Sequence, residues 1–332
     1  MKVIIAGAGM AGLACATALR STGHEVLLLD KGRGPGGRMA SRRLETPFGE
    51  AVFDLGAPAF TARDPMFQEQ VQQWAELGAV APWAAAGHDA WVGVPAMNAP
   101  LKALARDLDV HWGTRVSKLS STPDGWTITT DGNAVFQADA VVVALPAEQT
   151  ADLLASVAAR ISETARCSPS TPCWTVMLAF HERLPFPEDY LVGSDDGPLG
   201  LAIRNRAKPG RSGPETWVVH AGSDWSARNL ESPSGWIEET VFAALVDRLA
   251  VKVPVPIACA VHRWRYATPA SAGVGAAWDP RTGLGICGDW VAGPGVEGAW
   301  RSGMELARLV AGTSGARVRP RLHSLYQVET GV

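Results

Sequence analysis

Three glycines and an acid within the first thirty residues have the types and the spacing that bind a dinucleotide. Gly7, Gly9 and Gly12 follow the apolar run 2–6, and Asp30 ends a second apolar run about 18 residues beyond Gly12. Gly7 permits a tight turn, Gly9 lets a pyrophosphate approach the backbone, and Gly12 lets a helix pack against the strand. Asp30 can accept hydrogen bonds from both hydroxyls of a ribose, and it would repel a 2′-phosphate. The segment therefore predicts a nucleotide cofactor bound at a helix N-terminus.

A second glycine-rich segment, 32–38, follows this acid directly. It is either a flexible surface loop or a second phosphate clamp. In the clamp, Gly36 and Gly37 bring backbone N–H groups to the pyrophosphate, and Arg38 supplies a forked donor. Because a nicotinamide dehydrogenase needs no such element, the segment favours FAD over NAD as the cofactor.

The bare glycine pattern is weak on its own, since residues 32–37 and 293–298 also match it. Neither match is followed by a helix, a second strand and an acid at the required distance, so only the first has its context. Residues 1–16 also resemble a signal peptide with a small-residue cleavage site at 14–16. Three glycines within the apolar stretch and a strand that ends in an acid argue against that interpretation.

A second polar ligand site is indicated near the C-terminal end. Asp289 follows the short apolar run 284–287, and a glycine loop then leads into a helix. Asp289 would face a ligand hydroxyl, and the amides of Glu297, Gly298 and Ala299 would face negative charge. If the ligand is FAD, that charge develops on the N1–C2=O edge of the reduced ring system. The alternative is an aspartate that only caps a loop.

The elements that position these residues follow from hydrophobic periodicity. Short apolar strands are expected over 2–6, 26–29, 139–145 and 284–287; the third is apolar throughout, as in a parallel sheet that is buried on both faces. We further expect helices over 13–19, 63–78, 100–108 and 298–311, a strand over 111–119, and a hairpin over 126–137. The tail from residue 312 is basic and is expected to be exposed.

A stretch rich in Ser, Thr and Pro at 167–172 marks a change of architecture. Beyond it we expect several strands and a single helix, an order that is typical of a mainly antiparallel layer. The expected strands are 174–180, 199–203, 216–221 and 257–266, and the expected helix is 234–250. The predicted fold is therefore α/β with two domains. We expect residues 1–60, 94–165 and 260–332 to form a Rossmann-type FAD-binding domain, and 61–93 and 166–259 to form the substrate domain.

Composition excludes several classes of partner. The chain has 332 residues, of which 47% are hydrophobic and 19% charged, as in an ordinary globular protein. A net charge of −3 gives no basic field that would attract nucleic acid, and no apolar run is long enough to span a membrane. Five scattered cysteines without a C-x-x-C pair indicate neither a disulfide framework nor a metal site, and a cytoplasmic location is expected.

Several motifs together resemble the bacterial branch of the renalase family. The glycine and Gly-Asp motifs are shared with many FAD amine oxidases, whereas Arg-Asn-Arg at 204–206 and His-Arg-Trp-Arg-Tyr at 262–266 are more specific; the full set is 7–12, 30–31, 36–39, 54–57, 60–64, 202–206, 262–267, 288–290 and 296–300. The resemblance covers nearly the whole chain. It implies a hydroxybenzoate-hydroxylase-like fold, noncovalent FAD, and oxidation of 2-dihydro or 6-dihydro isomers of NAD(P) to NAD(P)⁺. Hydride would pass to flavin N5, and molecular oxygen would be reduced to hydrogen peroxide.

The resemblance also implies roles for individual residues. The ADP half and the pyrophosphate of FAD would be bound by Gly7, Gly9, Ala11, Gly12, Asp30, Lys31, Gly37 and Arg38, with the backbone of Val116 at the adenine. The ribityl chain and the ring would be held by Gly288, Asp289, Val296, Glu297 and Gly298. One departure concerns Pro58 and Ala59, which stand where relatives usually carry Gln-Tyr. The loss of an amide and a phenol there predicts a wider pocket and leaves room for a different substrate.

Hydride transfer needs no nucleophile, so the residues expected beside the substrate are those that orient it. Arg204 and Asn205 could hold a carboxamide or a phosphate, and His262 could form a hydrogen bond with the nicotinamide. Trp290 is expected to form a wall beside the flavin. For each of these side chains the alternative is a purely structural role.

Three other classes of function share these features. An aromatic monooxygenase that uses external NADPH has the same fold. An amine oxidase would need an aromatic cage beside the flavin, and the absence of a tyrosine at position 59 weakens that alternative. The last class is a flavin-loaded binding protein without turnover.

Overall fold

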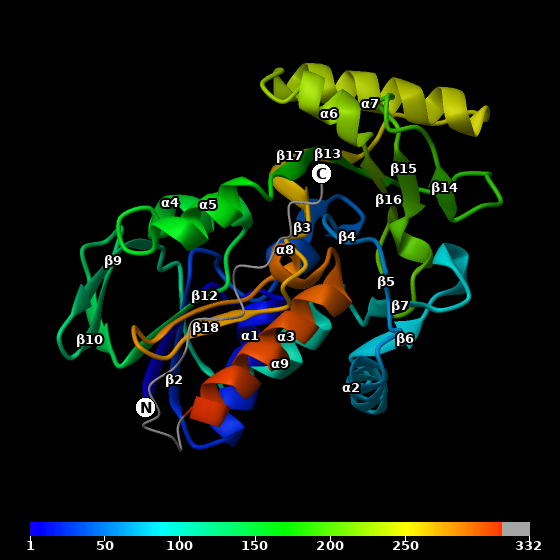
Figure 1. Cartoon of the computed structure of the whole chain (residues 1–332). Coiled ribbons are helices and arrows are strands. Elements are labelled where there is room, and N and C mark those ends of the chain that lie inside the picture. Colours follow the sequence, from blue (N-terminus) through cyan, green and yellow to red (C-terminus); the bar gives the residue numbers. More distant parts are fainter. Residues whose placement is uncertain (314–332) are drawn as a thin grey trace, which may run out of the picture.

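The computed structural model of the chain describes residues 1–313, and the predicted basic tail lies outside them from residue 314 on. A six-stranded sheet carries the glycine fingerprint, in the order β18-β19-β12-β1-β2-β8 (Figure 1). All neighbours in it are parallel except the pair β18–β19, and the strands are β1 Lys2–Ala6, β2 Glu25–Asp30, β8 Asp109–Trp112, β12 Ala140–Val143, β18 Ala277–Asp279 and β19 Leu284–Ile286.

Both faces of this sheet are covered, as its apolar strands predict. In β1, Val3 and Ile5 pack into one core cluster and Ile4 and Ala6 into another, because successive side chains point to opposite faces. The helices α1 (Met10–Ser21), α3 (Ala99–Ala105) and α9 (Val296–Thr313) lie together on one side (Figure 1). The other side carries a three-stranded sheet and two helices, namely β9 Val116–Thr122, β10 Gly125–Thr130, β11 Val135–Ala138, α4 Ala147–Leu154 and α5 Ala159–Arg166.

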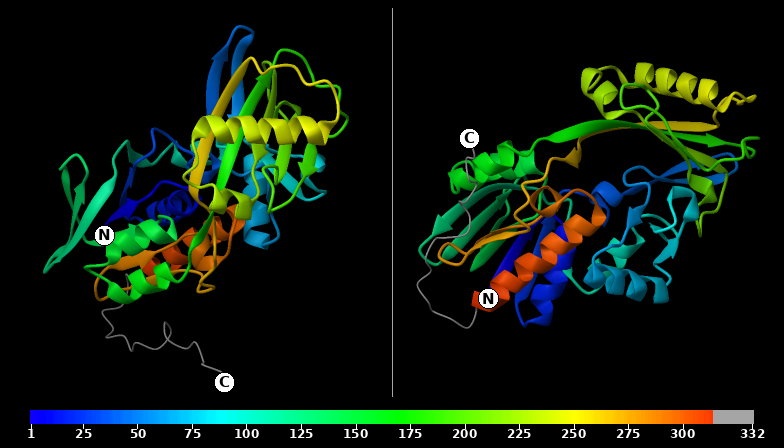
Figure 2. Two further views of the ribbon diagram at one scale, coloured as in Figure 1. Left: turned by 90° about the horizontal axis from the view of Figure 1, so that it is seen from above. Right: turned by 45° about the vertical axis from the view of Figure 1, so that its right-hand side comes forward.

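A separate five-stranded antiparallel sheet forms the second layer, in the order β14-β15-β16-β13-β17. Figure 2 shows α6 and α7 lying over its outer face. The opposite face packs on the hairpin β3–β4, where Phe53 contacts the same core cluster as Met177 and Val218. The bounds are β3 Ser41–Thr46, β4 Gly49–Asp54, β13 Ser170–Phe180, β14 Tyr190–Val192, β15 Leu201–Arg204, β16 Glu215–His220, β17 Ala258–Pro269, α6 Ser223–Arg228 and α7 Ser234–Leu249.

The predicted division of the chain needs correction at residue 260. That boundary assigned most of β17 to the FAD-binding domain, but β17 pairs with β13 along most of its length, with Thr175 opposite His262. Strand 257–266 therefore completes the antiparallel sheet. Segment 61–93 forms a small sheet and a helix, β5 Phe60–Thr61, β6 Val80–Pro82, β7 Ala90–Gly93 and α2 Pro65–Glu76. It packs on the FAD-binding side, since the ring of Phe67 lies 5.3 Å from that of Trp300 in α9.

Most of the expected elements are present, whereas α4, α5, α6 and β14 were not predicted. Helix α2 begins as expected, and the side chain of Asp64 accepts hydrogen bonds from the amides of Met66 and Phe67. The expected strand 111–119 is divided between β8 and β9, because Gly113 takes a positive φ of 68° and turns the chain. Strand β3 was not predicted either, since its exposed arginines hide the alternation that marks a strand.

No helix within residues 1–313 has both the length and the apolar character needed to cross a membrane. In the same range, no three His, Cys, Asp or Glu side chains are grouped so that they could hold a metal ion.

Candidate FAD and substrate site

A cavity of about 1620 Å³ lies between the carboxyl ends of the parallel strands and the antiparallel sheet. Asp30 and Ala144 line it at the ends of β2 and β12, and Cys173, His220 and His262 line it from the second sheet. Drug-sized ligands occupy pockets of about 300–1,000 Å³. The cavity therefore has room for a large cofactor together with a substrate.

The glycine fingerprint forms the part of the wall next to α1. Gly7 has a φ of 104°, and a Cβ there would lie 2.5 Å from the carbonyl oxygen of Ala144. A Cβ on Gly12 would meet the carbonyl oxygen of Gly7, so Gly12 serves the packing of helix on strand and does not line the cavity. Around Gly9 the Cβ position is open, and no side chain caps α1. The first amides of that helix are thus left for a ligand.

Asp30 is fixed at the end of β2 by two backbone amides. Its Oδ2 accepts from Ala8 N and its Oδ1 from Gly32 N, each at 2.6 Å. A carboxylate has about four acceptor positions, so it can still accept from ribose hydroxyls. Lys31 and Val116 line the cavity beside it, as the assignment of this region to the ADP half requires.

The second glycine segment reaches the same wall. Gly37 takes a φ of 52°, and its Cβ position lies 3.7 Å from the Cα of Gly9. The two glycine turns therefore face each other. Arg38 donates to Asp289, with 2.6 Å between Nη2 and Oδ1, so the two predicted FAD ligands are bonded to each other. Both of them line the cavity, as do Ala11, Gly288, Val296 and Glu297.

Gly298, by contrast, does not line the cavity. A Cβ there would meet the carbonyl oxygen of Gly293, so this glycine permits the close turn that starts α9. The side chain of Glu297 accepts a hydrogen bond from the amide of Arg63. The start of α9 is therefore tied to the segment that follows β5.

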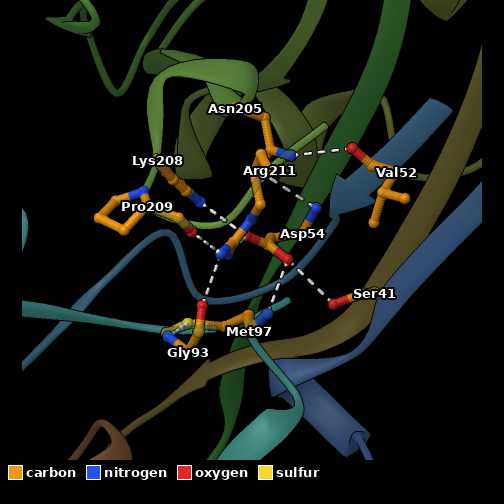
Figure 3. A network of polar contacts seen from close by, with 9 residues as sticks. All are labelled: Ser41, Val52, Asp54, Gly93, Met97, Asn205, Lys208, Pro209 and Arg211. Atoms are coloured by element: carbon orange, nitrogen blue, oxygen red, sulfur yellow. Dashed lines mark hydrogen bonds and ion pairs between the residues drawn. The ribbon is translucent and has the colours of Figure 1, made fainter. Parts of the chain in front are cut away.

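A network of polar contacts surrounds Asp54, which is fully buried together with Lys208 (Figure 3). Its carboxylate pairs with Lys208 Nζ at 3.0 Å and with Arg211 Nη2, and it accepts from the amide of Met97 at 2.8 Å and from the hydroxyl of Ser41 at 2.9 Å. Burial alone would raise the pKa of Asp54, but attraction to the two cations outweighs burial and lowers it to about 2. The network joins β4 to the loops after β7 and β15.

The Asp-Leu-Gly-Ala motif at 54–57 thereby holds the phosphate clamp in place. The amide of Ala57 donates to the carbonyl oxygen of Arg38 at 2.8 Å. A Cβ on Gly56 would meet that same carbonyl oxygen, so only glycine fits there. The motif therefore acts on the cofactor site by positioning the backbone of Arg38.

The prediction that Arg204 and Asn205 orient a substrate is wrong. Both side chains are fully buried, and neither lines the cavity. Arg204 lies 3.1 Å from carboxylate oxygens of both Asp189 and Glu215, and Asn205 donates to the carbonyl oxygen of Val52. A buried guanidinium needs such partners, so the Arg-Asn-Arg motif serves the fold.

Trp290 also differs from its prediction. It is fully buried outside the cavity, and its Nε1 donates to the carbonyl oxygen of Leu145 at 3.0 Å. Its ring lies close to the Cβ position of Gly288. Trp290 thus supports the loop that carries Asp289 and forms no wall of the site.

His262 does line the cavity, and the structure adds side chains that sequence reasoning missed. Cys173, Tyr190 and His220 line it as well. Alternation along β13 and β16 could have placed Cys173 and His220 on one face, but nothing in the sequence gives the register that brings those strands beside β17. Burial raises the pKa of the Cys173 thiol to about 12, so the thiol is protonated at neutral pH.

The fold and the cavity together define a two-domain flavin-dependent oxidoreductase. The residues present fit FAD, since a fixed acid, two facing glycine turns and an uncapped helix N-terminus follow one another along one cavity. The chain belongs to the flavin containing amine oxidoreductase family, whose sequence model matches residues 83–311; residues 5–74 match the NAD(P)-binding Rossmann-like domain. The predicted cofactor and enzyme class are confirmed at this level.

Two relatives of known name are similar in sequence to this chain. Mouse renalase is 24% identical over 293 residues, which are 80% of this chain and 84% of that protein, and the resemblance to renalases is thereby confirmed. Coproporphyrinogen III oxidase of Mycobacterium tuberculosis is 29% identical over 189 residues, which are 51% of this chain. The match spans only 38% of that oxidase.

Solved structures bear out the two-domain fold. A putative protoporphyrinogen oxidase from Exiguobacterium sp. 255-15 superposes with a TM-score of 0.72 at 12% identity, over 93% of this chain and 98% of that one. Cyclohexylamine oxidase from Brevibacterium oxydans superposes with a TM-score of 0.69 at 14% identity, over 95% of this chain and 99% of that one. At these identities the likeness concerns the fold alone.

Proposed function

We propose that the protein oxidises 2-dihydro or 6-dihydro isomers of NAD(P) to NAD(P)⁺ and passes the electrons to molecular oxygen. FAD, bound noncovalently, supplies the two-electron acceptor at N5, and two electrons and two protons leave with oxygen as hydrogen peroxide. The substrate ring loses one hydride and becomes aromatic. We keep the hydroxybenzoate-hydroxylase-like description of the fold and a cytoplasmic location as parts of this proposal, and the five free cysteines support the latter.

The observation that carries the proposal is the composition of the cavity wall on the antiparallel sheet. His262 and His220 are both held neutral at physiological pH, because burial lowers the pKa of each, assisted by the charge of Arg42 and of Lys208 respectively. The one thiol there, on Cys173, stays protonated. These three neutral side chains, beside Arg263 and Arg265 of β17, suit a substrate that is already a ready hydride donor and needs only orientation.

The chain's own groups would then act by orienting the substrate and by their electrostatic field. His262 would form a hydrogen bond with the nicotinamide, as the sequence suggested. Helix α9 begins at Val296 in the cavity wall, and the positive end of its dipole favours the extra negative charge on the ring system after reduction. Ala59 also lines the cavity, which supports the expected widening where relatives carry tyrosine.

Anaerobic mixing tests the proposal. The purified protein is expected to be yellow and to release FAD on acid denaturation. A mixture of the 2-dihydro and 6-dihydro isomers should bleach the flavin band rapidly, ordinary 4-dihydro NADH should bleach it slowly, and admitting air should restore the band with one peroxide formed per substrate. Bleaching by the isomers that is no faster than bleaching by 4-dihydro NADH would refute the proposal. Bleaching by NADPH only in the presence of an aromatic substrate would favour a monooxygenase.

A second candidate is oxidation of a porphyrinogen. It is favoured by the mycobacterial coproporphyrinogen III oxidases, which are more similar in sequence than mouse renalase, although over a shorter stretch. Coproporphyrinogen III and a primary amine therefore belong in the same anaerobic experiment. The substrate that bleaches the flavin fastest at equal concentration identifies the function.

A further inference from the structure

Two histidines of the cavity wall lie in one row across the antiparallel sheet. Thr175 in β13 is directly opposite His220 in β16 and directly opposite His262 in β17. Side chains of directly opposed residues project to the same face. Since neighbouring strands are about 4.8 Å apart, the backbones of the two histidines are about 10 Å apart, with Thr175 between them.

Thr175 fixes the tautomer of His220. Its side chain is fully buried, and its hydroxyl lies 3.5 Å from Nδ1 of His220 and also forms a hydrogen bond with the thiol of Cys173. The hydroxyl and the thiol each carry a proton, and the imidazole nitrogen is the strongest acceptor among them, so Nδ1 accepts a hydrogen bond. The thiol of Cys173 also lies 3.7 Å from this nitrogen. Because the ring is neutral, it carries its own proton on Nε2.

That Nε2–H group has no partner in the described part of the chain. The atom is buried without a hydrogen bond, although the ring forms part of the cavity wall. A buried donor without an acceptor is destabilising. An acceptor is therefore to be expected from whatever fills this part of the cavity.

His262 offers the complementary group. Among residues 1–313 no side chain or backbone atom forms a hydrogen bond with either nitrogen of its ring, which lies edge-on to Trp264 with 4.3 Å between ring centroids. A neutral imidazole has one donor nitrogen and one acceptor nitrogen. The row thus presents a fixed donor at His220 and an available acceptor at His262.

We infer that His220 and His262 together recognise a planar primary carboxamide. The carboxamide oxygen accepts from Nε2 of His220, and the carboxamide NH₂ group donates to the ring of His262. An amide oxygen and nitrogen with one hydrogen bond each span about 8 Å between the two ring nitrogens. Two side chains that project to the same face from backbones about 10 Å apart can reach that separation by leaning slightly towards each other. The inference deepens the proposed function and rests on it, because the nicotinamide ring of the proposed substrate carries this group.

The arrangement selects against other ligands. A carboxylate in place of the carboxamide can accept from His220 but has no proton to give to His262. An alkylammonium ion can donate to His262 but would place a positive charge against the Nε2–H group, next to buried Lys208, whose charge helps to lower the pKa of His220. Nicotinate and simple amines are therefore expected to bind more weakly than nicotinamide.

Binding of small ring ligands to the FAD-loaded protein tests the inference without turnover. Nicotinamide and nicotinate are titrated in the oxidised protein, and the change in the flavin spectrum gives each dissociation constant. The dissociation constant of the wild type for nicotinamide should be lower than that for nicotinate by about tenfold or more. This is the difference expected when one hydrogen bond is missing and its buried partner is left unpaired. His220→Leu and His262→Leu should each remove most of that preference, and His220→Gln, which keeps an N–H at a similar reach, should restore part of it.

His181→Leu is the matched control, since this exposed histidine directly follows β13 and does not line the cavity. FAD content and circular dichroism show which variants fold. An unchanged preference in folded His220→Leu, or a wild type without any preference, overturns the inference. The proposed function is judged separately by bleaching of the wild-type flavin with the dihydro isomers, so the two can fail independently.

Discussion

Nη2 of Arg38 lies 2.6 Å from Oδ1 of Asp289, and this ion pair joins two segments that are 251 positions apart in the chain. The carboxylate is nearly buried, with 6% of its side chain exposed, whereas 31% of the arginine is exposed. The loop after β2 and the loop after β19 are therefore fixed to each other. Pre-organised groups of this kind reduce the ordering that binding would otherwise require.

The two partners of this pair should respond differently to substitution. Arg38→Met leaves an almost buried carboxylate without its cation, so FAD affinity should fall by more than tenfold and the protein should lose stability. Asp289→Asn keeps a hydrogen-bond acceptor and removes the charge, so its effects should be smaller. Titration with FAD and thermal unfolding of the apoprotein measure both. Equal effects of the two changes would contradict this account of the pair.

Asp30 is expected to hold the ribose of the cofactor. Charge-assisted hydrogen bonds are worth about 1.5–3 kcal/mol each, so Asp30→Ala should weaken FAD by about tenfold or more. Asp107→Ala is a suitable control, because Asp107 is exposed and does not line the cavity. Dissociation constants from flavin fluorescence give the answer, and an Asp30 variant with wild-type affinity would remove this residue from the site.

The buried network around Asp54 predicts a loss of stability in acid. Its pKa is lowered to about 2 in the folded protein, against about 3.9 in an unfolded chain. Asp54 therefore stabilises the fold above about pH 4, and this contribution is lost as the pH falls towards 2. Asp54→Asn leaves Lys208 and Arg211 without their anion, so the free energy of unfolding at pH 7 should fall by about 3–5 kcal/mol.

Urea unfolding of wild type and Asp54→Asn at several pH values measures this effect. The difference between the two proteins should shrink between pH 4 and pH 2, since the variant has no carboxylate to protonate. A difference that stays constant over this range would show that the network contributes by its shape and not by its charge.

The sequence predicted those parts of the site that depend on local geometry. The turn at Gly7, the acid at the end of β2 and the start of α9 follow from residue types at fixed spacing along the chain. Arg204 was misplaced because a buried guanidinium and a substrate-binding one have the same sequence signal, and only the nearby Asp189 and Glu215 distinguish them.

The substrate side depends on contacts between distant segments. His220 and His262 become neighbours of Thr175 through the register of three strands that are well separated in the chain. No local pattern encodes that register. Residues 258–269 likewise join the antiparallel sheet as its edge strand β17. No local pattern indicates which sheet they join, and the predicted boundary at 260 was wrong for that reason.

Gly9 and Gly12 of the fingerprint should respond differently to substitution by alanine. Gly9 has a φ of −76°, which alanine adopts without strain, and no atom lies within 4 Å of its Cβ position. Gly9→Ala should therefore keep the stability of the apoprotein, whereas its methyl group would occupy the space that the pyrophosphate needs, and FAD binding should be lost. The Cβ of Gly12→Ala would meet the carbonyl oxygen of Gly7, so this variant should lose stability with or without FAD. Thermal unfolding with and without added FAD separates the two. A Gly9→Ala protein that still gains stability from FAD would show that the pyrophosphate does not cross this turn.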